Sequence, residues 1–87
     1  MDWTHAPRQI EGLEVNQLVD GYVIYEASRD RVHYLNHTAV LVLEMCNGRV
    51  MADEIPALLK QAYDLAEPPT AEVAKCLATL RDEGLIR

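Results

Sequence analysis

The first third of the chain alternates between hydrophobic and polar positions in the manner of short β-strands. Runs rich in β-branched and aromatic residues cover positions 13–19, 22–25 and 31–35. Asp20-Gly21 separates the first two runs, and this dipeptide is typical of a two-residue hairpin turn whose central residues have positive φ. A polar turn at positions 28–30 separates the second run from the third. The pattern therefore predicts a three-stranded antiparallel meander.

The third predicted strand, residues 31–35, is apolar in part on both of its faces. Successive side chains of a strand point to opposite faces, so Val32 and Tyr34 share one face, and His33 and Leu35 share the other. Neither face is cleanly polar, and an apolar face has to be covered by another layer. The pattern thus raises the question of what covers this strand, and whether the cover belongs to the same chain.

Beyond the third strand the pattern becomes helical. Asn36 can cap a helix, residues 39–46 are apolar almost all round, and Asn47-Gly48 follows them. The β-branched residues and the Asn-Gly pair would also suit a hairpin. We favour a helix because Asn36 and Gly48 stand where an N-cap and a C′ residue belong. A helix that is apolar all round is a buried one.

A second helix is expected from Asp53 onwards. Pro56 falls in its first turn, where the missing N–H has no hydrogen bond to lose. The spacing of the apolar residues in this segment is the spacing of one helix face. The apolar stripe comprises Ile55, Leu58, Leu59, Ala62 and Tyr63.

A third helix is expected after the chain break at Glu67-Pro68-Pro69. Thr70 is its predicted cap, and its apolar stripe comprises Val73, Cys76, Leu77 and Leu80. Gly84 supplies the C′ position, and Leu85 supplies the hydrophobic contact that usually follows it.

The order of elements, three strands and then three helices, predicts a small α+β domain related to winged helices. Three strands cannot bury a face without a second layer, which the helices provide. Residues 12–87 form this domain, and residues 1–11, which contain Pro7 and have no periodicity, are expected to be a flexible N-terminal arm. Trp3 either packs back on the domain or meets a partner.

Length and charge narrow the classes of function. A chain of 87 residues is one small domain with a modest core, and a hydrophobic share of 49% argues against disorder. The net charge of −6 disfavours nucleic acid, because non-specific affinity for it comes from cations that contact phosphates. The start has no signal-peptide pattern, and the longest apolar run is too short to span a bilayer. We expect a soluble cytoplasmic protein.

No catalytic or metal-binding pattern stands out. Ser28 is the only serine and lies in a predicted turn, the histidines are scattered, and no glycine-rich phosphate loop is present. Cys46 and Cys76 form no CxxC motif and are read as buried reduced thiols, with a disulfide or a metal pair as alternatives. Asp82-Glu83 is read as a solvated helix face. We therefore expect no enzyme activity, no cofactor and no metal.

From Gly21 onwards the chain resembles the PqqD family, the peptide chaperones of pyrroloquinoline quinone (PQQ) biosynthesis. The segments that carry the resemblance are "VHYLNHTAVLVLEMCNG", "ADEIPALLKQAY" and "VAKCLATLRDEGLI". Each motif is weak alone, since most of its residues are caps and core positions, and their order and spacing together are specific. Asn47 departs from the Asp that the family usually has before Gly48, and the N-terminal third matches poorly.

The resemblance implies a non-catalytic adaptor that binds the leader of a ribosomally made precursor peptide. The leader adds as a fourth strand beside residues 31–35, with side chains in the groove between that strand and the third helix. The adaptor presents the peptide to a modifying enzyme, for which a radical S-adenosylmethionine protein is one candidate. The implied peptide-binding residues are Arg31, Val32, His33, Tyr34, Leu35, Val73, Cys76, Leu77, Leu80 and Arg81.

Among these residues, His33 or Tyr34, whichever faces the groove, is expected to be selective, whereas Leu35 is expected to serve the core. Two other functions stay open. A winged-helix DNA-binding regulator would read bases with its third helix, which offers only Lys75 and Arg81 as cations. A homo-oligomer, such as a homodimer, would pair through the edge strand or through the arm that carries Trp3.

Overall fold

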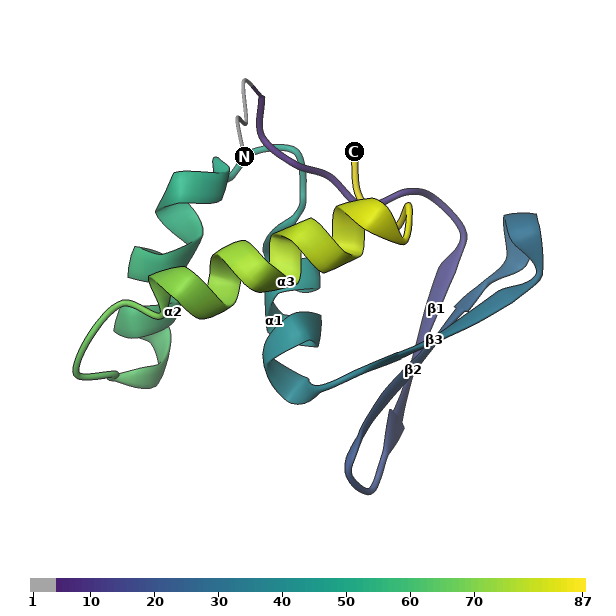
Figure 1. Cartoon of the computed structure of the whole chain (residues 1–87), viewed down its shortest axis with the longest axis horizontal. Helices are drawn as coiled ribbons and strands as arrows, with labels where there is room; N and C mark the ends of the chain where they lie inside the picture. The colour runs from purple at the N-terminus through teal and green to yellow at the C-terminus, as the bar shows by residue number, and fades with distance from the viewer. Residues whose placement is uncertain (1–4) are drawn as a thin grey trace.

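Three strands and three helices, in that order, make up the computed structural model, which describes residues 5–87 (Figure 1). The strands are β1 (Leu13–Leu18), β2 (Gly21–Glu26) and β3 (Arg31–Leu35), and the helices are α1 (His37–Met45), α2 (Ile55–Tyr63) and α3 (Thr70–Asp82). Short 3₁₀ turns at Ala27–Arg29 and Ala52–Glu54 precede β3 and α2. The predicted α+β class and order of elements are confirmed, and the likeness to winged helices is a loose one. Trp3 lies outside the described residues.

The sheet is a meander in the order β1-β2-β3, with both neighbouring pairs antiparallel. Ile24 pairs with His33, and both are buried, because α1 lies against β2 and β3 on that side. The period of two turns Val32 and Tyr34 to the opposite side, where they are 51% and 76% exposed. The helices of the same chain therefore cover one face of β3 and leave the other face open.

The first hairpin differs from the predicted turn. β1 ends at Leu18 and β2 begins at Gly21, so the two-residue loop is Val19-Asp20, and neither Asp20 nor Gly21 has a positive φ. Gly21 is required for another reason, because a Cβ placed there would lie 3.0 Å from the carbonyl oxygen of Leu35 on β3. The absence of a side chain at Gly21 lets the two strands approach each other.

The predicted helix after Asn36 is confirmed as α1. The Asn36 side chain accepts a hydrogen bond from the Ala39 N–H at 2.8 Å, which is the expected N-cap contact. Ala39, Val40, Val42 and Leu43 are buried, and the chain leaves the helix through Gly48, which has a φ of +81°.

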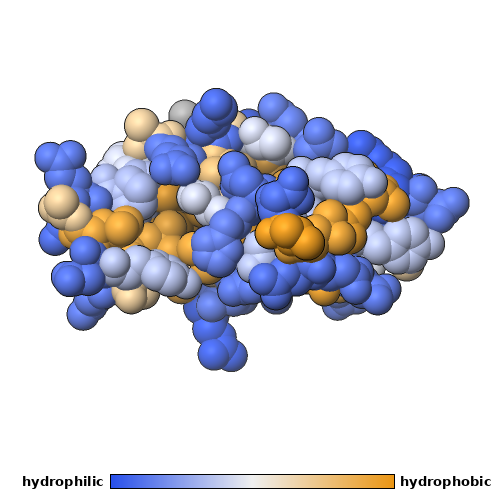
Figure 2. Space-filling view, turned by 90° about the horizontal axis from the view of Figure 1, so that it is seen from below, coloured by the Kyte–Doolittle hydropathy of each residue, from blue (hydrophilic) through white to orange (hydrophobic). Residues whose placement is uncertain are grey.

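Only part of the stripe predicted for α2 faces the core. Ile55, Pro56 and Leu59 are buried, whereas Leu58 and Tyr63 are 37% and 51% exposed and Ala62 is exposed as well. The reason is that α2 lies at the end of the molecule away from the sheet, where α3 packs against one side of it (Figure 1). Hydrophobic residues are consequently exposed on the helical half of the molecule, at the left of Figure 2, and also on the half that contains the strands.

The stripe of α3 is confirmed, since Val73, Leu77 and Leu80 are buried and Cys76 is half-buried. Thr70 is the first helical residue and not the cap, because Pro69 occupies the N-cap position without a side-chain hydrogen bond.

The C-terminal end of α3 is the predicted glycine cap. Gly84 has a φ of +76°, and the Leu85 N–H donates to the carbonyl oxygen of Leu80 at 2.9 Å. Leu85 is fully buried and joins a single core that extends from the sheet through all three helices. This core comprises Ile24, Val40, Val42, Leu43, Cys46, Ala52, Ile55, Leu59, Val73, Leu77, Leu80, Leu85 and Ile86.

Part of the expected N-terminal arm is fixed. Pro7 is buried, and backbone hydrogen bonds tie Arg8 to Arg87, Gln9 to Cys46 and Ile10 to Leu85. These pairings satisfy backbone groups of the chain end as well as those of the arm. The expectation of a flexible segment therefore does not describe residues 7–10.

Candidate functional site

A groove of about 260 Å³ separates the end of β3 from the outer side of α3. Leu35, Ala39, Cys76 and Leu80 give the groove an apolar floor, and polar atoms come from its rim. The remaining residues that line it are Tyr34, Asn36, Glu72, Lys75 and Thr79. A groove of this kind can accept an apolar side chain and leave the attached backbone exposed.

The groove lies beside an open strand edge. β3 pairs with β2 on one side, and among residues 5–87 no strand pairs with its other side. Such an edge presents N–H and C=O groups that a further strand can bind. The structure therefore combines backbone hydrogen-bonding groups with an adjacent apolar groove.

The residues predicted on β3 have different surroundings. Tyr34 and Leu35 line the groove, Tyr34 as a highly exposed side chain and Leu35 as a half-buried one. Val32 lies on the open face of the sheet, and Arg31 pairs with Glu83. His33 is only 7% exposed and does not line the groove. Of the two residues considered for selectivity, Tyr34 is thus the one at the groove.

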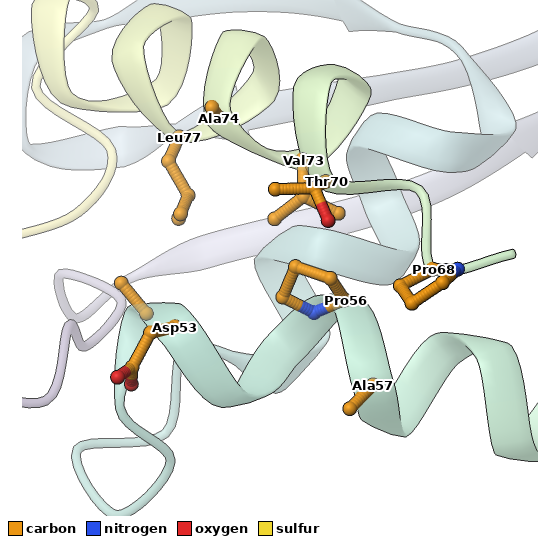
Figure 3. A pocket seen from close by; sticks show the side chains of 9 residues that line it. Asp53, Pro56, Ala57, Pro68, Thr70, Val73, Ala74 and Leu77 are labelled. Atoms are coloured by element: carbon orange, nitrogen blue, oxygen red, sulfur yellow. The ribbon is translucent and has the colours of Figure 1, made fainter.

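The residues predicted on α3 divide between two sides of the helix. Cys76 and Leu80 line the groove beside β3, while Val73 and Leu77 line a second hollow of about 430 Å³ between α2 and α3. Figure 3 shows Val73 and Leu77 pointing from α3 toward α2, on the side where Pro56 lies. Adjacent residues are about 100° apart around a helix, so one stripe of four can face two neighbours. Arg81 is exposed and lines neither hollow.

The buried carboxylate of Glu26 was not predicted from the sequence. Glu26 on β2 is wholly buried and accepts hydrogen bonds from the Arg29 guanidinium, including one from Nη2 to Oε1 at 2.8 Å. His33 Nε2 lies 3.0 Å from the same Oε1. A buried charge requires such partners, because desolvation would otherwise make it very costly.

The surroundings of Glu26 keep it ionised. The hydrogen bond from Arg29 lowers the pKa of Glu26 to about 2, with help from His33 and against the effect of burial, which raises it. The same hydrogen bond raises the pKa of Arg29. A sequence signal was available, since Glu26 shares the buried parity of Tyr22 and Ile24 on β2.

Glu83 links the end of α3 to this network. Its carboxylate lies 3.1 Å from Arg31 Nη2 and 3.5 Å from His33 Nδ1, and its carbonyl oxygen accepts a hydrogen bond from Arg29 Nη2 at 2.9 Å. The interpretation of Asp82-Glu83 as a solvated face is therefore incomplete for Glu83, whose half-exposed side chain also contacts β3. The signal was hidden because these partners are fifty or more positions away from Glu83 in the chain.

The two cysteines are free thiols, and the expected burial is confirmed for Cys46, whereas Cys76 is only half-buried. Cys46 is buried, and its burial raises the pKa of the thiol to about 12. Cys76 lies in the groove, where burial and then the charge of Glu72 raise its pKa. Both thiols are therefore protonated at neutral pH, and Cys76 is the more accessible one.

The fold and the site define a small α+β domain with an open strand edge beside an apolar groove. The chain belongs to the PqqD family: the model of the family described as Coenzyme PQQ synthesis protein D (PqqD) matches residues 21–86. No curated protein and no solved structure matches the chain. The family consists of non-catalytic accessory proteins, and membership supports an accessory role in biosynthesis of the PQQ type. Within residues 5–87, no helix has the length and hydrophobicity needed to cross a membrane.

Proposed function

We propose that this protein binds the leader of a ribosomally made precursor peptide by strand addition to β3. It then presents the bound peptide, in the cytoplasm, to a modifying enzyme such as a radical S-adenosylmethionine protein. The observation that carries the proposal is the open edge of β3 beside a groove lined by Leu35, Cys76 and Leu80. Family membership supports both kinds of partner, a precursor peptide and an enzyme that modifies it.

The energetics require both the edge and the groove. About four main-chain hydrogen bonds, at about 1 kcal/mol net each, contribute about 4 kcal/mol. Micromolar binding needs about 8 kcal/mol. Burial of two aliphatic side chains, at about 1.5–3 kcal/mol each, supplies the difference. The hydrogen bonds give affinity for an extended backbone, and the groove selects the sequence.

The chemistry of the groove indicates what the peptide carries. Because side chains alternate along a strand, every second residue of an added strand faces α3. The floor of the groove accepts an aliphatic side chain there, while Lys75 and Glu72 at the rim accept polar or charged neighbours. We expect a leader segment with apolar residues at alternate positions and a charged residue close to one of them.

The test is a titration of the ¹⁵N-labelled protein with precursor peptides encoded close to its gene. The proposal predicts that the amides of residues 31–35 shift with a saturable dependence on peptide concentration. It also predicts that bound peptide slows alkylation of Cys76, whereas Cys46, which is 1% exposed, serves as an internal control. Unchanged amides at residues 31–35, with every peptide from the neighbourhood, would overturn the proposal.

A homodimer that pairs through β3 would hide the same edge. Sedimentation of the free protein at several concentrations separates this case from a monomer with a free edge. If peptide binding weakens as the dimer forms, the two processes compete for β3. The titration should therefore be made at the lowest protein concentration that the spectra allow.

A further inference from the structure

His33 stands between two carboxylates that come from different parts of the chain. Its Nε2 lies 3.0 Å from Glu26 Oε1 on β2, and its Nδ1 lies 3.5 Å from Glu83 Oε2 just beyond α3. The charged side chains that make up this network are Glu26, Arg29, Arg31 and Glu83. The ring is 7% exposed, so the carboxylates rather than water are its neighbours on both sides.

The number of protons on His33 decides how many of these contacts are hydrogen bonds. A neutral imidazole has one N–H and can donate to one carboxylate only, whereas an imidazolium has two and can donate to both. Histidine changes its charge between about pH 5 and 8. Glu26 stays ionised over this interval, since its pKa is about 2 and the hydrogen bond from Arg29 is the main cause of that low value. The contact between His33 and Glu83 is therefore the one that responds to the proton.

Glu83 also joins the end of α3 to β3, through residues that do not line the groove. β3 supplies one wall and α3 the other, and the Glu83 carboxylate contacts Arg31 and His33 of β3 from the end of α3. The Glu83 side chain is half-exposed and so has room to move, whereas Glu26 is fixed within the core. A change in the Glu83 contacts is thus a change in how α3 is held against β3.

We propose that the contact between His33 and Glu83 is a pH-responsive latch that holds the C-terminal end of α3 against β3. Protonation of His33 closes the latch, and loss of the proton leaves Glu83 held through Arg31 and through its own carbonyl oxygen. Glu83 is then a positioning residue for the groove wall. The effect on peptide affinity rests on the proposed function, while the latch itself can be measured without a peptide.

The first experiment follows the free protein by NMR as the pH is varied between about 5 and 8. The His33 ring and the backbone amides of residues 82–84 should titrate together in the wild-type protein. In Glu83→Gln, which has no negative charge at this position, those amides should no longer follow the ring. Asp82→Asn removes the neighbouring exposed charge and is the matched control, so its amides should still follow the ring.

A second variant guards against a folding defect. Glu83→Asp keeps the charge and shortens the side chain by one methylene, and it should also uncouple the amides from the ring. Circular dichroism checks that each variant is folded. If the wild-type amides of residues 82–84 do not move when the His33 ring titrates, or if Asp82→Asn abolishes the coupling as Glu83→Gln does, the latch is refuted.

The second experiment measures the affinity for a precursor peptide at both ends of the same pH range. A closed latch should favour binding, and one partly exposed ionic contact corresponds to about a two- to fivefold difference in affinity. The wild-type and Asp82→Asn proteins should show this loss as the pH rises, and Glu83→Gln should show a flatter profile with the same peptide. Equal profiles in all three proteins would overturn the role of Glu83 in binding. Absence of any peptide binding would overturn the proposed function and leave the result of the first experiment intact.

Discussion

At the scale of single residues, exposure separates those that serve binding from those that serve the core. Tyr34 is 76% exposed at the groove, while Leu35, its neighbour in sequence, is half-buried against the core cluster. Exposed aromatic residues are frequent anchors in interfaces because they bury a large area on binding. Truncation of Tyr34 should therefore weaken peptide binding, and truncation of Leu35 should lower the stability of the fold.

We predict that Tyr34→Ala weakens peptide binding by about tenfold and changes the free energy of unfolding by less than about 0.5 kcal/mol. Leu35→Ala should instead cost about 1–3 kcal/mol of stability, because it removes partly buried methyl groups. Calorimetric titration and urea unfolding measure the two effects. Val19→Ala, at an exposed position in the first hairpin loop and outside β3, is the control, and it should change neither quantity much. A loss of stability without a loss of affinity in Tyr34→Ala would contradict the assignment.

The buried carboxylate predicts a specific dependence of stability on pH. The pKa of Glu26 is about 2 in the folded protein, below its ordinary value of 4.5. A lowered pKa means that ionised Glu26 stabilises the folded state at neutral pH, and that this contribution is lost as the pH falls from about 4.5 toward about 2.

We therefore expect Glu26→Gln to be less stable than the wild type at neutral pH, with a difference that shrinks under acid conditions. Urea unfolding at a series of pH values measures it. Glu14→Gln, an exposed position on β1, is the control and should follow the wild type. A difference between wild type and Glu26→Gln that is constant with pH would show that Glu26 carries no charge-dependent stability.

At the scale of elements, the sequence predicted those features that depend on local pattern. The period of two in β3, the cap at Asn36 and the glycine cap after α3 each follow from neighbouring residues, and each is present. The first hairpin turn was misplaced because Asp-Gly is common in turns. Here Gly21 is instead needed because the backbone of β3 lies too close to leave room for a side chain. That contact joins residues distant in sequence, so no local pattern contains it.

The candidate site was predictable in part for the same reason. The strand edge and the groove side of α3 follow from periodicity and from the resemblance to the PqqD family. The separation of Val73 and Leu77 from Cys76 and Leu80 does not, because it depends on which neighbour packs on each side of α3. The network around Glu26 was missed because its partners come together only when α3 folds back on the sheet.

The end of α3 gives a prediction with a matched control. Gly84 and Gly12 both have positive φ, at +76° and +80°, so an alanine at either position is strained by about 1–2 kcal/mol. A Cβ at Gly84 would also lie 2.6 Å from Arg29 Nη2, whereas a Cβ at Gly12 meets nothing within 4 Å. The Arg29 side chain could move, but it would then lose its contact with Glu26.

Gly84→Ala should consequently destabilise the protein more than Gly12→Ala, and it should also disturb the His33 ring signals in NMR spectra. Thermal unfolding gives the comparison of stability. Equal losses for the two variants, with unchanged His33 signals in both, would mean that Arg29 accommodates the new methyl group without cost to the network.

At the scale of the whole molecule, the helices provide most of the core, and the sheet provides the open edge proposed to bind a peptide. The helices lie on one side of the sheet and bury one of its faces (Figure 1). α3 also supplies a wall of the groove, and β3, which is last in the strand order, keeps an edge available. The network of Glu26, Arg29, His33 and Glu83 joins the sheet to the C-terminal end of α3. The acidic net charge of −6 is consistent with a peptide partner and disfavours nucleic acid.

The central claim, that a leader peptide adds as a strand to β3, is tested most directly by isotope-filtered NMR. Nuclear Overhauser effects should be observed between the labelled protein and an unlabelled precursor peptide at saturation. The account predicts contacts from the backbone protons of residues 31–35 to the peptide backbone, and from Cys76 and Leu80 to alternate peptide side chains. Contacts confined to β1, or to the hollow between α2 and α3, would contradict it.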